Sequence, residues 1–429
     1  MSIITRLRKL SLVPVILLWL LASCSEAPAQ TPPAGQTIDQ MLAAYPFIRR
    51  DLNVIRNDST ALAGFYEKLW ELKQGKRKSV SILHIGDSHI QADFLSGTVR
   101  ANFQTEFGNA GRGLVFPYRV AKSNEPWTYK TTAAGNWNSR RMLKAEPNLP
   151  IGLCGFTLEA IDTMAAFGLK VSPQGSLNYA FNKITVLHSS GPGSFNVAVC
   201  DPFNCRIGTK QPSAAAFATV FTFDSLRDEI VIDCIPADSA ARRLQIYGMV
   251  LENQQPGILY HMVGVNGGEY RNYNAAEFFL DQLTSLIPDL VIVSLGTNEG
   301  FSTSYSDVAY RKNIELFIQR LKTVAPQTAI LTTTPGDSFR RTRRGFLKNP
   351  DMGKARKTLL AASDSLGTAS WDLYGVMGGY GSMSKWYVAG LSHKDRLHFN
   401  KKGYQLQGEL LSMAIMAGYD KYVIRVHGK

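Results

Sequence analysis

Ser88 stands where a serine can act as a nucleophile, at the turn between a predicted strand and a predicted helix. The apolar run over residues 80–85 ends at Gly86, which predicts a buried strand. Beyond Ser88, apolar residues recur at every fourth position, as on one helix face: Leu95, Val99, Phe103 and Phe107. The N–H groups at the start of a helix stabilise negative charge beside a hydroxyl. Because Gly-Asp-Ser is also an ordinary turn and N-cap sequence, a structural role stays open.

Three later stretches carry side chains that could assist such a serine. Apolar runs over residues 258–263 and 291–294 lead into Gly-Val-Asn-Gly-Gly at 264–268 and Gly-Thr-Asn-Glu at 296–299. Further along the chain, Asp395 and His398 are separated by two residues. That spacing allows a tight loop, in which the carboxylate holds one ring nitrogen while the other faces the serine.

Together the four stretches resemble, in type and order, the four blocks of the SGNH (GDSL-type) hydrolases. The resemblance extends to the peptidoglycan O-acetylesterase branch, in which His follows Gly-Asp-Ser, as His89 does here, and a β-rich module separates the first two blocks. Ile90 and Gln91 depart from the small residues of that branch, which leaves the acceptor pocket and the exact substrate open. No G-x-S-x-G elbow occurs, which argues against the common α/β-hydrolase plan.

The chemistry expected of these residues is ester hydrolysis through an acyl-enzyme. Ser88 would attack the ester carbonyl, His398 would accept its proton and return it to the leaving alcohol, and Asp395 would orient the imidazole. The resemblance implies an oxyanion hole made of the Ser88 N–H, the Gly267 N–H and the Asn298 amide. Either neighbouring glycine, 264 or 268, is an alternative to Gly267.

Further candidates for substrate binding are less specific. His89 and Gln91 are candidates for such a role because they follow Ser88 closely, although His89 could equally cap or brace the turn. A segment over residues 337–348 contains four candidate arginines: Arg340, Arg341, Arg343 and Arg344. They could hold an anionic group such as a muramyl lactate or a peptide carboxylate. A solvated loop is the competing interpretation.

The first 23 residues read as an export signal. Basic residues precede an apolar run over residues 10–21 that is short for a membrane span. The run ends in Leu-Ala-Ser-Cys, which resembles a bacterial lipobox and would make Cys24 the lipidated first residue. The expected location is therefore an outer-membrane-anchored lipoprotein facing the periplasm or the cell surface. Cleavage at Ala-Pro-Ala, residues 27–29, would instead release a soluble protein.

Composition divides the remainder of the chain into a tether over residues 24–37 and three further parts. Residues 38–121 and 256–429 carry the four blocks, and from 258 onward strand and helix patterns alternate, which predicts a parallel sheet covered on both faces. Short strand-like runs separated by turn residues fill 122–255, which predicts an inserted β-sandwich. The fold class is therefore a three-layer α/β/α SGNH hydrolase with a flavodoxin-like parallel sheet. The resemblance makes the insert a jelly-roll module like a carbohydrate-binding domain.

Four cysteines fall inside the predicted insert: Cys154, Cys200, Cys205 and Cys234. An even number in an exported module predicts two disulfides, Cys200 with Cys205 and Cys154 with Cys234, although three connectivities are possible. Zinc is a weaker alternative, because the spacing is not that of a ribbon or finger. The expected chemistry needs neither a metal nor an organic cofactor, and no HExxH, P-loop or dinucleotide fingerprint occurs.

The formal net charge of +13 suits an anionic partner such as a cell-wall polymer or a membrane surface. Nucleic acid is disfavoured, because the basic residues are dispersed and no nucleic-acid motif occurs. The leading hypothesis is a serine esterase that removes O-acetyl groups from an envelope glycan, foremost the muramyl C6 O-acetyl of peptidoglycan. An O-acetyltransferase with the same triad and a non-catalytic glycan-binding lipoprotein are the alternatives.

Overall fold

The computed structural model describes residues 38–191, 193–202, 206–211, 213, 217–235 and 243–429. The predicted signal segment, the tether with Cys24, and Cys205 all lie outside the described residues. Within the described ranges, no helix has both the length and the apolar character that crossing a membrane requires.

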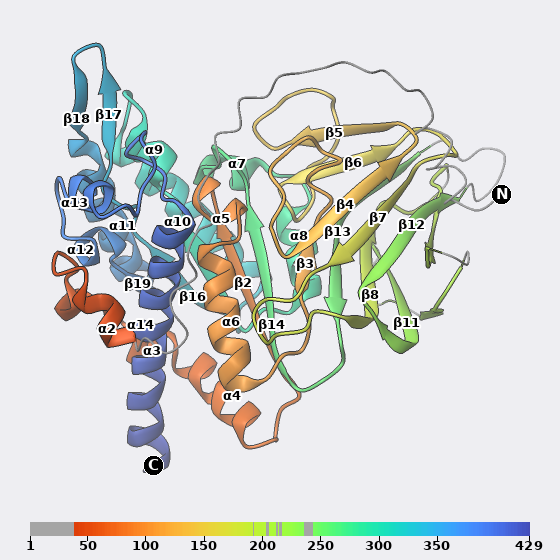
Figure 1. Ribbon diagram of the computed structural model, residues 1–429, viewed down its shortest axis with the longest axis horizontal. Helices are drawn as coiled ribbons and strands as arrows, with labels where there is room; N and C mark the ends of the chain where they lie inside the picture. The colour runs from red at the N-terminus through yellow and green to blue at the C-terminus, as the bar shows by residue number, and fades with distance from the viewer. Residues whose placement is uncertain (1–37, 192, 203–205, 212, 214–216, 236–242) are drawn as a thin grey trace.

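A six-stranded sheet lies at the centre of the part that carries the four motifs (Figure 1). Neighbouring strands pair in parallel, except that β1 runs antiparallel to β19 at one edge. In spatial order the strands are β1 (Ile55–Arg56), β19 (Ala369–Trp371), β16 (Ala329–Thr333), β15 (Leu290–Ser294), β2 (Ser79–Gly86) and β14 (Gly257–Gly264). The sequence therefore predicted a parallel sheet correctly. The predicted strand ends agree with the observed ones to within a residue or two.

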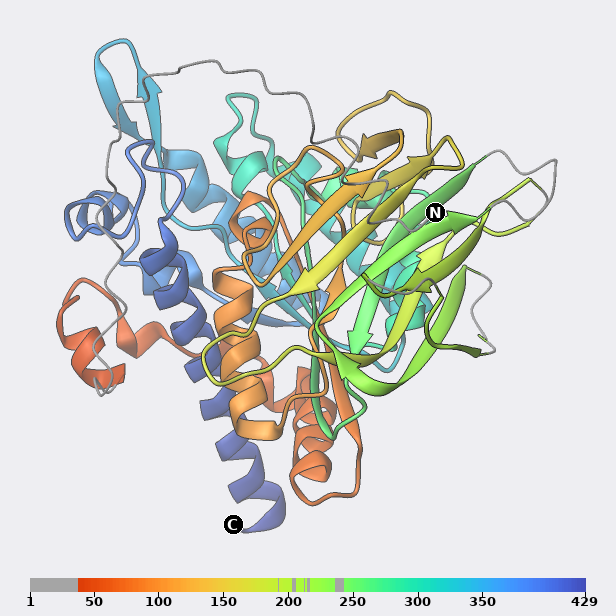
Figure 2. The same ribbon diagram turned by 45° about the vertical axis from the view of Figure 1, so that its right-hand side comes forward.

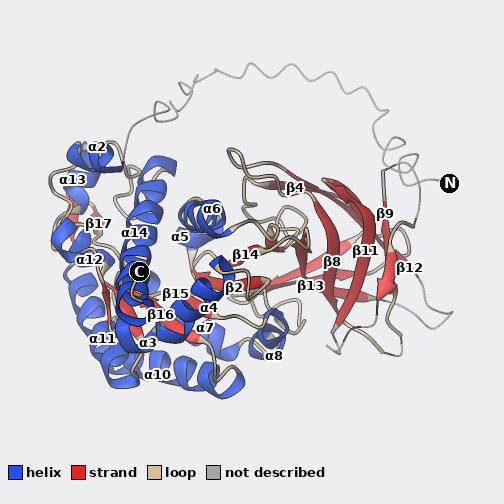
Figure 3. Ribbon diagram, turned by 90° about the horizontal axis from the view of Figure 1, so that it is seen from below, coloured by secondary structure: helices blue, strands red, loops and turns tan. Residues whose placement is uncertain are grey.

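Helices cover both faces of this sheet, as Figure 3 shows from below. The strand β2 explains why two cores form, because its side chains alternate between them: Val80 and Ile82 belong to one hydrophobic cluster, Leu83 and Ile85 to the other. The first cluster is completed by α4 (Ala63–Lys73), α6 (Leu95–Phe107) and α14 (Lys401–His427). The second is completed by α10 (Asp307–Val324) and α11 (Pro350–Leu366).

Shorter helices connect these elements. They are α2 (Ile38–Ala43), α3 (Asp58–Ala61), α5 (Ser88–Gln91), α7 (Tyr270–Ala275), α8 (Phe279–Leu283), α9 (Thr297–Phe301), α12 (Leu373–Val376) and α13 (Met383–Val388). The helices α3 and α4 are separated only by Leu62. The helix α6 has the bounds that its apolar spacing indicates.

The described strands between the first and second motifs pair in two antiparallel sheets, seen on the right of Figure 1. One sheet contains β10 (Thr209–Gln211), β11 (Ala218–Arg227), β8 (Phe181–His188), β13 (Leu244–Glu252), β6 (Phe156–Ala160) and β5 (Trp137–Arg141), with β3 (Gly113–Val115) beside β13. The other contains β4 (Tyr129–Ala134), β7 (Ala166–Val171), β12 (Glu229–Ile235) and β9 (Asn196–Cys200). Both views in Figures 1 and 2 place these sheets alongside the parallel sheet.

A buried ion cluster joins the two parts of the molecule. Both carboxylate oxygens of Asp93 bind Arg100, and one also binds Arg112, at distances of 2.7–3.1 Å. Arg112 further donates to Thr128 and Arg100 to Tyr179, residues that lie at or between the antiparallel strands. Burial alone would raise the pKa of Asp93, but the two guanidinium charges lower it overall. The cluster therefore fixes the antiparallel sheets to the helix that follows the serine motif.

The predicted disulfide between Cys154 and Cys234 is wrong. Both side chains are free, buried thiols, and burial raises the pKa of each. Cys154 lies just before β6 and packs against Gly248 of β13, whereas Cys234 is on β12 of the other sheet. The two sulfurs serve as small apolar groups in the core between the sheets, which the count of cysteines could not indicate.

Candidate active site

The register of three neighbouring strands brings three of the sequence motifs to one edge of the sheet. Gly86 at the end of β2 lies opposite Gly264 at the end of β14 and Ser294 at the end of β15. The segments that follow therefore start side by side. They carry Ser88 on α5, the glycine loop after β14, and Asn298 on α9.

Ser88, His398 and Asp395 form a continuous hydrogen-bonded chain. The Ser88 Oγ lies 3.0 Å from His398 Nε2, and His398 Nδ1 lies 2.7 Å from Asp395 Oδ2. The other carboxylate oxygen of Asp395 accepts the backbone N–H groups of Leu397 and His398, each at 3.0 Å. The short loop thus orients its own carboxylate, and the arrangement matches the serine–base–acid geometry of nucleophilic catalysis.

The charges around the imidazole favour its role as a base. Burial alone would raise the pKa of Asp395, yet the hydrogen bonds from His398 and the two backbone N–H groups lower it overall, so the group is a carboxylate. The hydrogen bond to Asp395 raises the pKa of His398 above its ordinary value of 6.5, and partial burial only partly opposes this. A neighbouring carboxylate would therefore stabilise an imidazolium at His398.

Gly267 is placed better than its neighbours to donate to an oxyanion. The Gly268 N–H already donates to the Val265 carbonyl at 2.8 Å, and Gly264 is part of β14. The Gly267 N–H has no protein acceptor within the described residues. Its φ of 81° is a conformation that favours glycine, and an added Cβ would lie 2.9 Å from Leu143 Cδ2.

Asn298 lies beside the serine, with its amide directed at protein acceptors. Its Nδ2 donates to the Gly268 carbonyl at 2.9 Å and approaches Asp87 Oδ2 at 3.4 Å. In the longer of these two contacts, an oxyanion could replace Asp87 as the partner of the Asn298 amide. Asp87 itself is buried and accepts the His89 N–H at 2.9 Å, which caps α5, and burial raises the pKa of Asp87 to about 6.

His89 lies behind His398 and braces it. The two imidazole rings are stacked, with centroids 5.2 Å apart and planes at 25°. The edges of Phe399 and Tyr404 complete the surroundings of the His89 ring. The geometry therefore matches the bracing role that the sequence left open, and gives no support to contact with substrate.

Gln91 is buried and occupied by protein contacts, so it is not placed to touch a substrate. Its Nε2 donates to Ser123 Oγ at 2.8 Å and to the Asn124 carbonyl at 3.0 Å, and its Oε1 accepts the Asn266 N–H at 2.7 Å. The side chain therefore ties the glycine loop to the segment that leads into the antiparallel sheets. The sequence suggested that Gln91 contacts the substrate. In the structure its side chain instead positions the glycine loop.

The arginine-rich segment is a hairpin of β17 (Phe339–Thr342) and β18 (Gly345–Lys348), which projects at the top of Figure 1. Arg340 is not available to a substrate, because it pairs with Asp351 at 2.9 Å and donates to three backbone carbonyls at the end of α9. The other three arginines are exposed: Arg341, Arg343 and Arg344. The hairpin is attached to the loop of the base through a hydrogen bond from Phe339 N–H to the Arg396 carbonyl.

Sequence reasoning gave no role to three residues that the structure places at the site. Asp87 belongs to the Gly-Asp-Ser motif, but the sequence indicated no role of its own for this residue. Leu143 follows β5 and touches the glycine loop, a contact that no local pattern indicates. Tyr404, on the first turn of α14, hydrogen-bonds to His89 at 3.0 Å across 315 positions of sequence.

The sequence model of the GDSL-like lipase/acylhydrolase family matches residues 234–406. This span contains the glycine loop, Asn298, Asp395 and His398, but not Ser88, which precedes the antiparallel sheets. No curated protein sequence matches the chain.

A solved structure of a peptidoglycan O-acetylesterase has the same fold. It superposes with a TM-score of 0.70 over 86% of this chain and 99% of that chain, at 20% identity. A lipase/acylhydrolase from Enterococcus faecalis (18% identity, 38% of this chain and 77% of that chain, TM-score 0.29) and an acetyl xylan esterase (17%, 37% and 81%, 0.32) are similar over a smaller part. The family-model match and the shared fold agree with the resemblance to SGNH hydrolases, and the chain shares the fold of this peptidoglycan O-acetylesterase over most of its length.

Proposed function

We propose that this chain, which resembles the SGNH hydrolases in its motifs and fold, is a serine esterase that removes O-acetyl groups from a cell-envelope glycan. The observation that carries the proposal is the hydrogen-bonded chain from Ser88 through His398 to Asp395. It lies at the edge of the sheet where the oxyanion donors also gather.

The reaction has two halves. In the first, Ser88 Oγ attacks the acetyl carbonyl while His398 Nε2 accepts the serine proton, and the negative charge moves to the carbonyl oxygen. The N–H groups of Ser88 and Gly267 and the amide of Asn298 stabilise this oxyanion. Collapse expels the sugar alcohol, protonated by His398, and leaves acetyl-Ser88. Water then repeats the sequence, with His398 again the base, and releases acetate.

The substrate that we propose is the C6 O-acetyl of muramyl residues in peptidoglycan. The shared fold with a peptidoglycan O-acetylesterase and the basic composition of the chain support this choice. The three exposed arginines of the β17–β18 hairpin supply cations for the carboxylates of a peptidoglycan strand.

The proposal includes the organisation and location of the chain. Residues 38–121 and 256–429 form the hydrolase, and 122–255 form an inserted jelly-roll-like module that binds glycan. An export signal over residues 1–23 and lipidation at Cys24 anchor the protein in the outer membrane, facing the periplasm. Loss of membrane association in Cys24→Ala, measured by cell fractionation, tests the anchor.

The test of function compares wild type with Ser88→Ala on two substrates, O-acetylated peptidoglycan and 4-nitrophenyl acetate. We expect acetate release from both by wild type and from neither by the variant. Turnover of 4-nitrophenyl acetate alone would indicate that the natural substrate is another acetylated glycan. Release that is unchanged in Ser88→Ala would refute the mechanism. Transfer of acetyl to an added saccharide, in place of acetate release, would make the chain an acetyltransferase.

A further inference from the structure

The orientation of the His398 ring depends on contacts other than Asp395. Ser88 and Asp395 hold its two nitrogens, and one face of the ring rests on His89. A ring that is held only through its two nitrogen atoms can tilt about the line that joins these atoms. A flat ring stacked on its face opposes that tilt.

A hydrogen bond to Tyr404 holds one nitrogen of the His89 ring. The Tyr404 hydroxyl lies 3.0 Å from His89 Nδ1. A neutral imidazole accepts at one ring nitrogen and donates from the other, so a hydroxyl that donates to Nδ1 leaves the ring proton on Nε2. The Tyr404 ring also packs against the ring of Phe399, the residue that directly follows His398.

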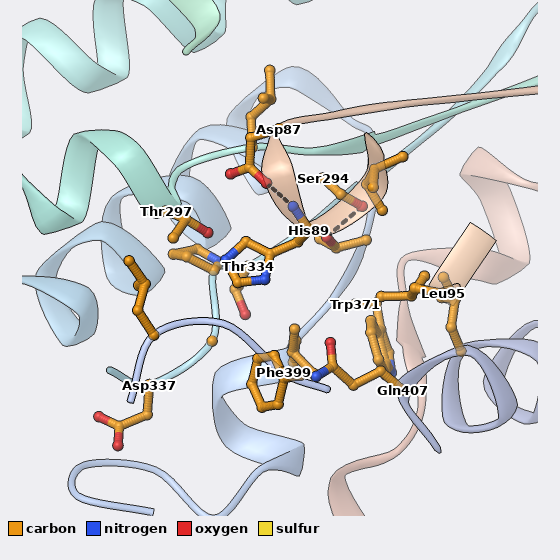
Figure 4. Close-up of a pocket in the computed structure, with 18 residues that line it drawn as sticks. Asp87, His89, Leu95, Ser294, Thr297, Thr334, Asp337, Trp371, Phe399 and Gln407 are labelled. Carbon is orange, nitrogen blue, oxygen red and sulfur yellow. Dashed lines mark hydrogen bonds between the residues drawn. The ribbon is translucent and has the colours of Figure 1, made fainter. Parts of the chain in front are cut away.

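His89 lines a small cavity, and Figure 4 shows its side chain among the other lining residues. The cavity has a volume of about 30 Å³, and Thr297, Thr334 and Gln407 contribute to its wall. Among the described residues, neither His89 Nε2 nor Gln407 Nε2 has a hydrogen-bond partner, and both atoms are shielded from solvent. A space of this size holds one or two water molecules. The Thr334 hydroxyl already bonds to Asp372 and to the Tyr374 N–H, so His89 Nε2 and Gln407 Nε2 are the atoms left for such water to satisfy.

We propose that His89 is a positioning residue for His398: a neutral imidazole, fixed by Tyr404 on one nitrogen and by ordered water in the cavity on the other, that supports the face of the base. This inference rests on the proposed function, because it concerns the serine esterase reaction of the same site. Burial lowers the pKa of His89 to about 3, and the nearby His398 contributes in the same direction, so His89 carries no charge that would repel the imidazolium. The charged groups that face His398 are the carboxyl groups of Asp395 and Asp87.

Two substitutions at His89 distinguish the contribution of a flat ring from the contribution of its nitrogen atoms. His89→Phe keeps a flat ring against His398, whereas His89→Ala removes it. A misplaced catalytic group can lower the rate by roughly 10²-fold, so we expect that loss of kcat in His89→Ala, with KM for 4-nitrophenyl acetate unchanged. His89→Phe is expected to recover most of the rate. Equal rates for the two folded variants, or a change confined to KM, would overturn the proposal.

A matched control and a milder variant accompany these changes. His188→Phe makes the same substitution at a buried histidine on β8, which bonds to Thr219 and the Ser189 carbonyl far from the site, and its kcat should equal that of wild type. Tyr404→Phe removes only the hydroxyl, so it tests the same contact even if His89→Ala fails to fold. We expect it to lower kcat about tenfold, and wild-type kcat in this variant would contradict the role of Tyr404.

Nitrogen NMR of the histidine rings gives a readout that does not depend on turnover. In the full chain, His89 should remain neutral and protonated on Nε2 from about pH 5 to about pH 9. In Tyr404→Phe, the preference for that tautomer should weaken. A His89 ring that titrates within this range, or that carries its proton on Nδ1, would overturn the inference. A wild-type chain without esterase activity would instead refute the proposed function.

Discussion

Replacing Asp395 with asparagine should inactivate the enzyme more severely than deleting the carboxylate. In the structure, Asp395 Oδ1 accepts two backbone N–H groups at 3.0 Å each, and Oδ2 accepts His398 Nδ1 at 2.7 Å. The asparagine oxygen must take the first position, because an NH₂ group there would face two donors. Its NH₂ group must then face Nδ1, which places the proton of His398 on Nε2, where the base should accept the proton of Ser88.

The size of the effect follows from this reversed tautomer. The same change in other Ser-His-Asp enzymes lowers kcat by about 10⁴-fold, which corresponds to roughly 5.5 kcal/mol of transition-state stabilisation. In Asp395→Ala, Nδ1 has no enforced partner, so both tautomers are populated and more activity should remain.

The assay is hydrolysis of 4-nitrophenyl acetate by wild type and both variants, with thermal melting curves to establish that each is folded. We expect wild type to exceed Asp395→Ala, and Asp395→Ala to exceed Asp395→Asn. A folded Asp395→Asn variant within tenfold of wild type would refute the reasoning. So would a folded Asp395→Ala variant that is less active than Asp395→Asn.

Four other predictions concern the site and its support. Activity of wild type should fall as the pH drops through the raised pKa of His398, and the residual activity of Asp395→Ala should fall at a lower pH, because the group that raises this pKa has gone. Asn298→Ala should lower kcat by about 10²–10³ with little change in KM, and an unchanged kcat would remove the amide from the oxyanion hole. Gln91→Ala should lower kcat about tenfold through the glycine loop that it holds, and an effect on KM alone would argue for substrate contact. Asp93→Asn should cost roughly 3–5 kcal/mol in urea unfolding, because two buried arginines lose their carboxylate, and a loss below 1 kcal/mol would contradict that account.

The elements of the parallel sheet were predictable because each is specified locally. Continuous apolar runs such as 290–294 are typical of strands covered on both faces, and the four-residue spacing on α6 and α10 is typical of helices with one buried face. Side chains at the carboxyl ends of neighbouring parallel strands must come together, which is why Ser88 and Asn298 could be expected at one edge.

What the sequence did not reveal depends on contacts between distant segments. The burial of Gln91 is set by Ser123 and Asn266, neither of which is in its own helix. The long helix α14 has apolar residues around much of its circumference, so no single stripe indicated its 27 residues. The sequence left the arginine segment open between an anion-binding stretch and a solvated loop. In the structure Phe339 and Phe346 pack around Arg396, and the segment forms a hairpin.

Detection of the acyl-enzyme tests the central claim most directly. Wild type would be mixed with excess 4-nitrophenyl acetate, quenched in acid during the first turnovers, digested and analysed by mass spectrometry, beside Ser88→Ala. We predict an acetyl group on the peptide that contains Ser88 in wild type, with none in the variant. Acetylation of another residue, or acetate release with no acetylated peptide at any quench time, would contradict the account.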